Sequence, residues 1–392
     1  MTAWLGFLLA MVALLAISQK NLGVAMFVGA FILGIATAPN SLPAILWSTI
    51  TDPSTVLLAL IVGLIPIIGG TLESSGQMDN LVSNMRIGKK AFLMLSPALV
   101  GMLPMPGGAL LSAPLIEKGG KDISSEKKAG LNVWFRHVLY LIYPLSPDLM
   151  VSTTIAQVDM YQAIPYLIPA LFFSLLLGYF FFLRDAPGDM DYEGDFSLTN
   201  LFLPLTAILI APILDVLLKT FFAPSVKESA TLMGVLASLA TALVIGREVL
   251  RKLGRIVAEA KPWNFSLMIV GIMFFLDVFD GSGIPQSIGT VFVTREILFA
   301  AGFVLGFSTG RIVTPAGIIF LILAKFGAIS LPTFAIMYFS IFLGYVITPV
   351  HPCVSLSMES FNIGIKDYFK TVMPPTLIAF FASFFLLDAT FL

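Results

Sequence analysis

Long runs of apolar residues, separated by short polar segments, extend along the whole chain. Ten of these runs are long enough to cross a membrane as α-helices, because a helix needs about 20 apolar residues to span the hydrocarbon layer. They lie at 3–19, 21–38, 54–73, 130–156, 161–183, 199–222, 228–246, 264–281, 331–358 and 371–391. The pattern predicts an all-α polytopic membrane protein with about ten transmembrane helices.

Two further apolar segments, 91–116 and 297–324, are interrupted near their middle by Gly, Pro and polar residues. Basic residues flank the first segment at both ends, so a full crossing would place one basic cluster outside the cell. If both segments are re-entrant hairpins instead, sixteen of the 22 basic residues lie on one side and four on the other. Cytoplasmic loops are enriched in Lys and Arg, so this asymmetry favours two hairpins and places both termini outside the cytoplasm.

A nine-residue pattern, P-x-x-P-x-x-x-x-S, occurs at Pro144–Ser152 and again at Pro349–Ser357. Each copy lies inside an apolar segment, where two nearby prolines remove backbone donors and break the helix. Other Gly- and Pro-rich positions in the two halves are separated by nearly the same number of residues as the two copies. This indicates that the chain repeats a unit of five crossings. An odd number of crossings makes the second repeat inverted relative to the first. The predicted division is a first repeat at 1–183, a cytoplasmic linker at 184–198 and a second repeat at 199–392.

Composition narrows the class of protein further. The chain is 58% hydrophobic and only 11% charged, with a net charge of −1, so nothing points to nucleic-acid binding. The single Cys353 excludes an internal disulfide and a site with several Cys ligands. The chain contains neither a phosphate-binding G-x-x-x-x-G-K-[ST] motif nor an H-E-x-x-H zinc motif. We expect no cofactor or resident metal, and partners limited to the bilayer and a small substrate.

Paired, Pro-interrupted helices in corresponding halves of a membrane protein indicate a transport site near the bilayer midplane. Free N–H groups at half-helix N-termini suit an anion, and free carbonyls suit a small cation. Arg311, at the predicted tip of the second hairpin, would hold the anion; the alternative is that it pairs with an internal acid such as Asp277. The predicted substrate-binding residues are Arg311, Gly107, Gly108, Ser152, Thr314, Gly317 and Ser357.

The same breaks predict a site for a coupling cation, Na⁺ or H⁺. A carboxylate or an imidazole beside each broken helix is suited to bind or carry it, although each would also cap a half-helix. The predicted residues are Pro106, Asp148, Pro315, Thr348 and His351. Arg136 and His137 precede the first break, and for Arg136 we favour a structural role near the interface.

Three motifs carry a resemblance to a known superfamily: Leu-Pro-Met-Pro-Gly-Gly-Ala at 103–109, Trp-Phe-Arg-His at 134–137 and Thr-Pro-Val-His-Pro at 348–352. The chain resembles the ion-transporter superfamily, which includes gluconate, citrate, C4-dicarboxylate and arsenite permeases, and within it an archaeal and bacterial integral-membrane family of unassigned function. The resemblance implies an elevator-type secondary transporter of organic anions, driven by Na⁺ or H⁺, usually a homodimer in the cell membrane. Dicarboxylate members carry Ser-Asn-Thr at both hairpin tips, where this chain has Pro-Gly-Gly and Thr-Pro-Ala-Gly.

Two alternatives from other classes remain open. An anion channel would more often repeat subunits around a pore with a ring of filter residues. An intramembrane enzyme acting on a lipid or small molecule could use Asp148, His351 and Asp277 as an acid–base set. Turnover with a chemically unchanged substrate distinguishes transport from the enzyme.

Overall fold

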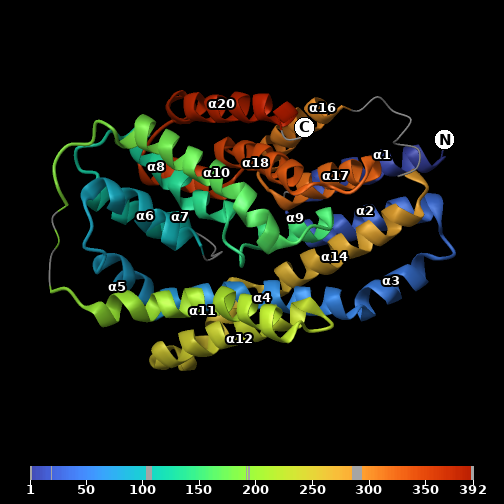
Figure 1. Cartoon of the computed structure of the whole chain (residues 1–392), viewed down its shortest axis with the longest axis horizontal. Coiled ribbons are helices and arrows are strands. Elements are labelled where there is room, and N and C mark those ends of the chain that lie inside the picture. Colours follow the sequence, from blue (N-terminus) through green and yellow to red (C-terminus); the bar gives the residue numbers. More distant parts are fainter. Residues whose placement is uncertain are drawn as a thin grey trace. The chain divides into compact units, whose positions relative to one another are not determined.

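The computed structural model describes residues 2–18, 20–102, 108–190, 192, 195–284 and 294–389 (Figure 1). Throughout these ranges the regular elements are helices and no strand forms, which confirms the predicted all-α polytopic membrane protein. The chain divides into two compact units. Unit 1 comprises Met1–Met78, Phe202–Phe292 and Leu321–Ala328, and unit 2 comprises Asp79–Leu201, Val293–Phe320 and Ile329–Leu392. Each unit takes segments from both predicted repeats, and the repeat boundaries themselves stay a prediction.

Unit 1 is built on packing between helices that are far apart in the sequence. Helix α2 packs on both α1 and α14, and α4 packs on both α12 and α14. Gly271 of α14 lies against the backbone oxygen of Gly23 of α2, so that a Cβ added there would meet that oxygen at 2.8 Å. Small residues let transmembrane helices approach this closely. The helices of unit 1 are α1 (Thr2–Ser18), α2 (Leu22–Thr37), α3 (Leu42–Thr51), α4 (Pro53–Ser74), α11 (Leu198–Phe222, from Phe202 in this unit), α12 (Lys227–Ile245), η3 (Arg247–Lys252), α13 (Leu253–Ala260), α14 (Pro262–Gly281) and η4 (Ala324–Phe326).

Unit 2 is organised around one buried helix, α18. In the most apolar 18-residue window of Leu331–Ser360, 83% of the residues are buried, against 28% in the corresponding window of Ile365–Leu386. Helix α18 packs on α10, α16 and α20, so its side chains form the centre of this unit. The helices of unit 2 are α5 (Gln77–Ser83), α6 (Lys89–Gly101), α7 (Gly108–Gly119), α8 (Ser125–Val138), η1 (Leu139–Leu141), α9 (Pro147–Ala156), α10 (Met160–Gly178), η2 (Tyr179–Leu183), α16 (Arg295–Thr309), α17 (Val313–Leu323, up to Phe320 in this unit), α18 (Leu331–Ile347), α19 (Pro352–Ser360) and α20 (Ile365–Ala389).

Helix ends lie at both predicted hairpin tips and at both predicted helix breaks in unit 2, and the re-entry of the two helix pairs into the membrane stays a prediction. Helices α6 and α7 pack side by side as the arms of the first hairpin (Figure 1). Helices α16 and α17 form the second, joined by only three residues, 310–312. Helices α9 and α19 begin at Pro147 and Pro352, the second proline of each repeated pattern. Proline is favoured in the first turn of a helix because its missing N–H has no intrahelical partner there.

Seven helices in the described residues are long and apolar enough to cross a membrane by length and composition. They coincide with seven of the ten predicted crossings, and the other three differ for physical reasons. Helices α1 and α2 are apolar but have only 17 and 16 residues. The predicted crossing at 130–156 is divided into α8, η1 and α9, as expected for a helix broken at its prolines.

Candidate functional site

A buried asparagine joins three helices of unit 2. Asn132 of α8 donates from Nδ2 to Ser357 Oγ of α19 at 2.9 Å and to the Ala109 carbonyl of α7 at 3.0 Å. Its Oδ1 accepts a hydrogen bond from Ser112 Oγ of α7 at 2.5 Å. Asn132, Ser112 and Ser357 are fully buried. One amide therefore ties an arm of the first hairpin to both broken helices.

One helical turn after Asn132, Arg136 places a guanidinium in the same buried region. The residue is only 3% exposed, and its Nη1 lies 3.5 Å from Ser112 Oγ. Gly108, the first residue of α7, lies so close that a Cβ added there would overlap the guanidinium. Among the described residues, no carboxylate forms an ion pair with Arg136 within 4.0 Å. Buried charges are normally paired, so a guanidinium in this position has the capacity to bind an anion.

The tip of the second hairpin carries the other internal guanidinium. Gly310 adopts a left-handed conformation (φ +61°), and a Cβ added to it would meet the Val350 and His351 backbone at 3.0 and 2.9 Å. The tip therefore packs directly on the break between α18 and α19. Arg311 follows and attracts Asp148, in the first turn of α9, electrostatically.

Within the described ranges, the charge of Arg311 is not matched by a direct ion pair. No described carboxylate lies within 4.0 Å of its guanidinium nitrogens. The alternative partner considered from the sequence, Asp277, belongs to unit 1, where it accepts a hydrogen bond from Thr49 Oγ1. The carboxylate that attracts Arg311 within unit 2 is Asp148, whose position in the first turn of α9 also suits the helix dipole.

Three buried hydroxyls near the breaks have no hydrogen-bond partner within the described part of the chain. They belong to Ser146 and Ser152 around the start of α9 and to Thr314 near the start of α17. An unpaired buried hydroxyl is costly, so it marks a place where a ligand or a water bonds to it. Ser152 and Thr314 are both among the predicted substrate-binding residues.

Apart from His351, which lies at the break before α19, the remaining predicted site residues fall into three groups. Pro106 and Gly107 lie outside the described residues. Thr348 ends α18, and its Oγ1 accepts a hydrogen bond from the Val350 N–H at 3.2 Å. Thr314, Pro315 and Gly317 lie inside the first turns of α17 rather than in irregular backbone. A proline at the third helical position is tolerated because that N–H has no intrahelical acceptor. The irregular backbone of the second hairpin is therefore confined to 310–312.

Two features of this site went unrecognised in the sequence. The first is Asn132, which is four residues from Arg136 and therefore shares a helix face with it. A polar pair at this spacing within the segment 130–156 was the available signal. The second is the depth of Arg136: the sequence favours a structural role near the interface, and the structure shows Arg136 buried in unit 2, against Gly108 and Ser112 of the first hairpin. The contact of Arg136 with the hairpin agrees with a structural role. Its burial also places there a positive charge that no described carboxylate pairs.

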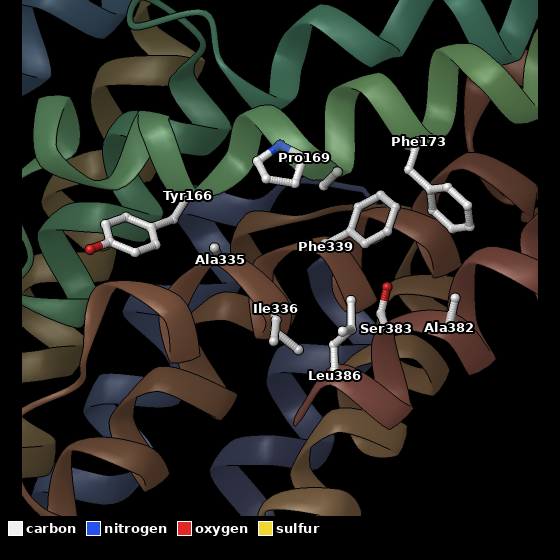
Figure 2. Close-up of a pocket in the computed structure, with 10 residues that line it drawn as sticks. Tyr166, Pro169, Phe173, Ala335, Ile336, Phe339, Ala382, Ser383 and Leu386 are labelled. Carbon is white, nitrogen blue, oxygen red and sulfur yellow. The ribbon is translucent and has the colours of Figure 1, made fainter. Parts of the chain in front are cut away.

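A separate cavity of about 300 Å³ lies in unit 2 between α10, α18 and α20 (Figure 2). Its walls are almost entirely apolar, and the polar side chains among its lining residues are Tyr166 and Ser383. The Ser383 hydroxyl donates to the Ala379 carbonyl of its own helix. With no charged side chain among the described residues that line it, this cavity suits an acyl chain better than an anion.

Comparison with protein families identifies the group to which the chain belongs. Residues 2–387 match the family described as "Protein of unknown function (DUF401)". Because the match covers nearly all 392 residues, the chain belongs to this family. No curated protein sequence matches the chain.

Two solved structures have a similar fold. The YdaH transporter of Alcanivorax borkumensis aligns with a TM-score of 0.60 at 14% identity, over 89% of this chain and 87% of that one. MtrF of Neisseria gonorrhoeae, described among a class of antimetabolite efflux pumps, aligns with a TM-score of 0.49 at 15% identity, over 90% of this chain and 84% of that one. At this identity the YdaH alignment establishes a shared fold.

Proposed function

We propose that the protein is a secondary active transporter of a small organic anion with a carboxylate-like group. The observation that carries this proposal is the buried Arg136 guanidinium, which has no ion-pair partner among the described carboxylates and which lies against a hairpin arm. A forked guanidinium is the side chain best suited to grip a carboxylate with two hydrogen bonds.

The second guanidinium extends the same argument. Arg311 lies on the opposite hairpin, and Ser152 and Thr314 add hydroxyls whose hydrogen bonds are unfilled by the described residues. Two guanidiniums and Asp148 leave a net positive charge for the substrate to neutralise. We assign Arg136 and Arg311 as the anion-holding groups, with Gly108 allowing close approach at the first hairpin and Ser357 fixing Asn132 beside it.

For the coupling cation, Na⁺ or H⁺, the groups beside the two breaks remain our assignment. Asp148 supplies a half-buried carboxylate at the start of α9, and Thr348 supplies oxygen atoms at the end of α18. Cation binding at Asp148 weakens its attraction for Arg311 and so frees that guanidinium for the anion. In this form of coupling, cation binding raises the affinity for the anion, and anion binding raises the affinity for the cation by the same factor.

We propose that transport proceeds by elevator-type alternating access. We further propose that the protein is a homodimer in the cell membrane, with both termini outside the cytoplasm. The shared fold with a protein described as a transporter supports transport over an intramembrane enzyme or a channel. Membership of the ion-transporter superfamily, which the sequence motifs suggested, stays a prediction.

A reconstituted system tests the proposal. Purified protein in proteoliposomes receives a Na⁺ gradient or a pH gradient separately, and radiolabelled organic anions are screened for concentrative uptake. Concentrative uptake of a chemically unchanged anion under one gradient is the expected result, and it names the coupling ion. Rapid downhill flux that neither gradient drives would indicate a channel, and a chemically altered product would indicate an enzyme.

A further inference from the structure

The chain contains only two histidines and one cysteine in 392 residues, and unit 2 brings all three together. His137 lies near the end of α8, His351 immediately before α19, and Cys353 at the second position of α19. The two histidines are 214 residues apart in the sequence, yet their Nε2 atoms are separated by 3.1 Å. The two imidazoles and the Cys353 sulfur offer ligand atoms that all lie within 4.8 Å of one another.

The orientation of His137 leaves its inner nitrogen available as a ligand. Its Nδ1 lies 2.6 Å from the Val133 carbonyl oxygen, which can only accept, so the proton resides on Nδ1. The Nε2 lone pair then faces His351. Metal-ligating histidines almost always donate their other N–H in this way, because it fixes the tautomer and the ring orientation.

The spacing of the two nitrogens also fits a metal ion. Two imidazole nitrogens bound at about 2.0 Å to a tetrahedral centre are roughly 3.3 Å apart, close to the observed 3.1 Å. A thiolate bound at about 2.3 Å would lie roughly 3.5 Å from each nitrogen. Rotation of the short Cys353 side chain covers the difference from the observed separation, which is at most 4.8 Å. The Tyr345 ring, centred 4.2 Å from the His351 ring, holds that imidazole in place.

From this geometry we propose that His137, His351 and Cys353 form a binding site for a soft d¹⁰ metal ion, Cu⁺ or Zn²⁺. Thiolate and imidazole ligands select these ions over Na⁺, Mg²⁺ or Ca²⁺, which prefer oxygen. Arg136 lies beside the Cys353 sulfur, and its positive charge favours the singly charged Cu⁺ over Zn²⁺. Three protein ligands leave a further coordination position open. The site adjoins the proposed anion-holding Arg136, but metal binding is measured without transport, so the two proposals fail separately.

A direct hydrogen bond between the two imidazoles is the competing explanation of the short distance. It requires His351 to carry its proton on Nε2 and donate to His137, whereas a metal ion requires both lone pairs. The two arrangements differ in whether the purified protein takes up metal with defined stoichiometry, which makes them separable by titration.

The test uses full-length protein purified in detergent without a polyhistidine tag, under reducing and anaerobic conditions. Cu⁺ is offered as its complex with a chromophoric chelator, and Zn²⁺ is titrated by calorimetry. His137→Gln, His351→Gln and Cys353→Ala are compared with Ser360→Ala, a matched control at the exposed end of α19. Because the chain has no other His or Cys, these variants remove every side-chain ligand of this type.

The expected result is one Cu⁺ or Zn²⁺ per chain in the wild type and in Ser360→Ala, with at least tenfold weaker binding in each of the three variants. Co²⁺ offered as a spectroscopic probe should give thiolate-to-metal absorption that Cys353→Ala abolishes. If the wild type takes up neither metal at one equivalent, the proposal is wrong, even if the variants fail to fold. Binding that persists at full strength in His137→Gln and His351→Gln would also overturn it.

Discussion

Replacement of Asn132 by Ala removes the side-chain hydrogen bonds that connect α8 to α7 and α19. The amide makes three hydrogen bonds, to Ser112, Ala109 and Ser357, and all three are buried. Side-chain hydrogen bonds inside membrane proteins are worth about 0.6 kcal/mol each, and ordinary buried ones about 1 kcal/mol. Three such bonds therefore correspond to about 2–3 kcal/mol of stability.

For a chain of this length, a loss of that size lowers the melting temperature by about 3 °C. Thermal unfolding in detergent, measured by intrinsic fluorescence at a fixed scan rate, provides the assay. Asn40→Ala, at an exposed position, serves as the matched control and should melt with the wild type. If Asn132→Ala melts within the error of Asn40→Ala, the amide does not hold the three helices together and the reasoning fails.

Three further substitutions test the hairpins. Gly108→Ala should abolish uptake, because the new Cβ would overlap the Arg136 guanidinium. Gly254→Ala is the control and should leave uptake unchanged, because a Cβ added there meets nothing within 4 Å. Equal uptake by both variants would contradict the close approach of Gly108 to Arg136. Arg311→Ala should abolish transport at normal expression, measured by uptake per amount of protein, and unchanged uptake would remove Arg311 from the site. Gly310→Ala should destabilise the protein by about 1–2 kcal/mol in a melting assay, because a left-handed residue with a Cβ is strained; a wild-type melting temperature would show that the tip relaxes freely.

The fold was largely predictable because its main signals are local. The length of an apolar run predicts a membrane crossing. Paired prolines predict a helix break because proline has no backbone N–H to donate. Helices α9 and α19 accordingly begin at Pro147 and Pro352. The extent of the second hairpin's tip was less predictable, because Pro315 is compatible both with a loop and with the first turn of a helix. The structure places it in α17.

The site was predictable in part, for a different reason. Arg311, Ser152 and Thr314 could be proposed because each is a polar residue in an apolar segment. The convergence of Asn132 with Ser357, or of His137 with His351, depends on how α8 and α19 pack. Contacts between residues more than 200 positions apart are set by tertiary packing, and no local pattern reports them. The repeated Pro pattern indicated that the two breaks correspond, but not which side chains they bring together.

The most direct test of the account is gradient-driven anion uptake by wild-type protein and by Arg136→Gln in parallel proteoliposomes. Gln keeps much of the side-chain length and a hydrogen-bonding amide but removes the charge, so it isolates the guanidinium that no described carboxylate pairs and on which the proposed anion site rests. Arg184→Gln, at an exposed position, controls for loss of a positive charge. The account predicts concentrative uptake by wild type and Arg184→Gln, and at least a tenfold loss in Arg136→Gln at equal reconstitution. Wild-type uptake by Arg136→Gln would contradict it.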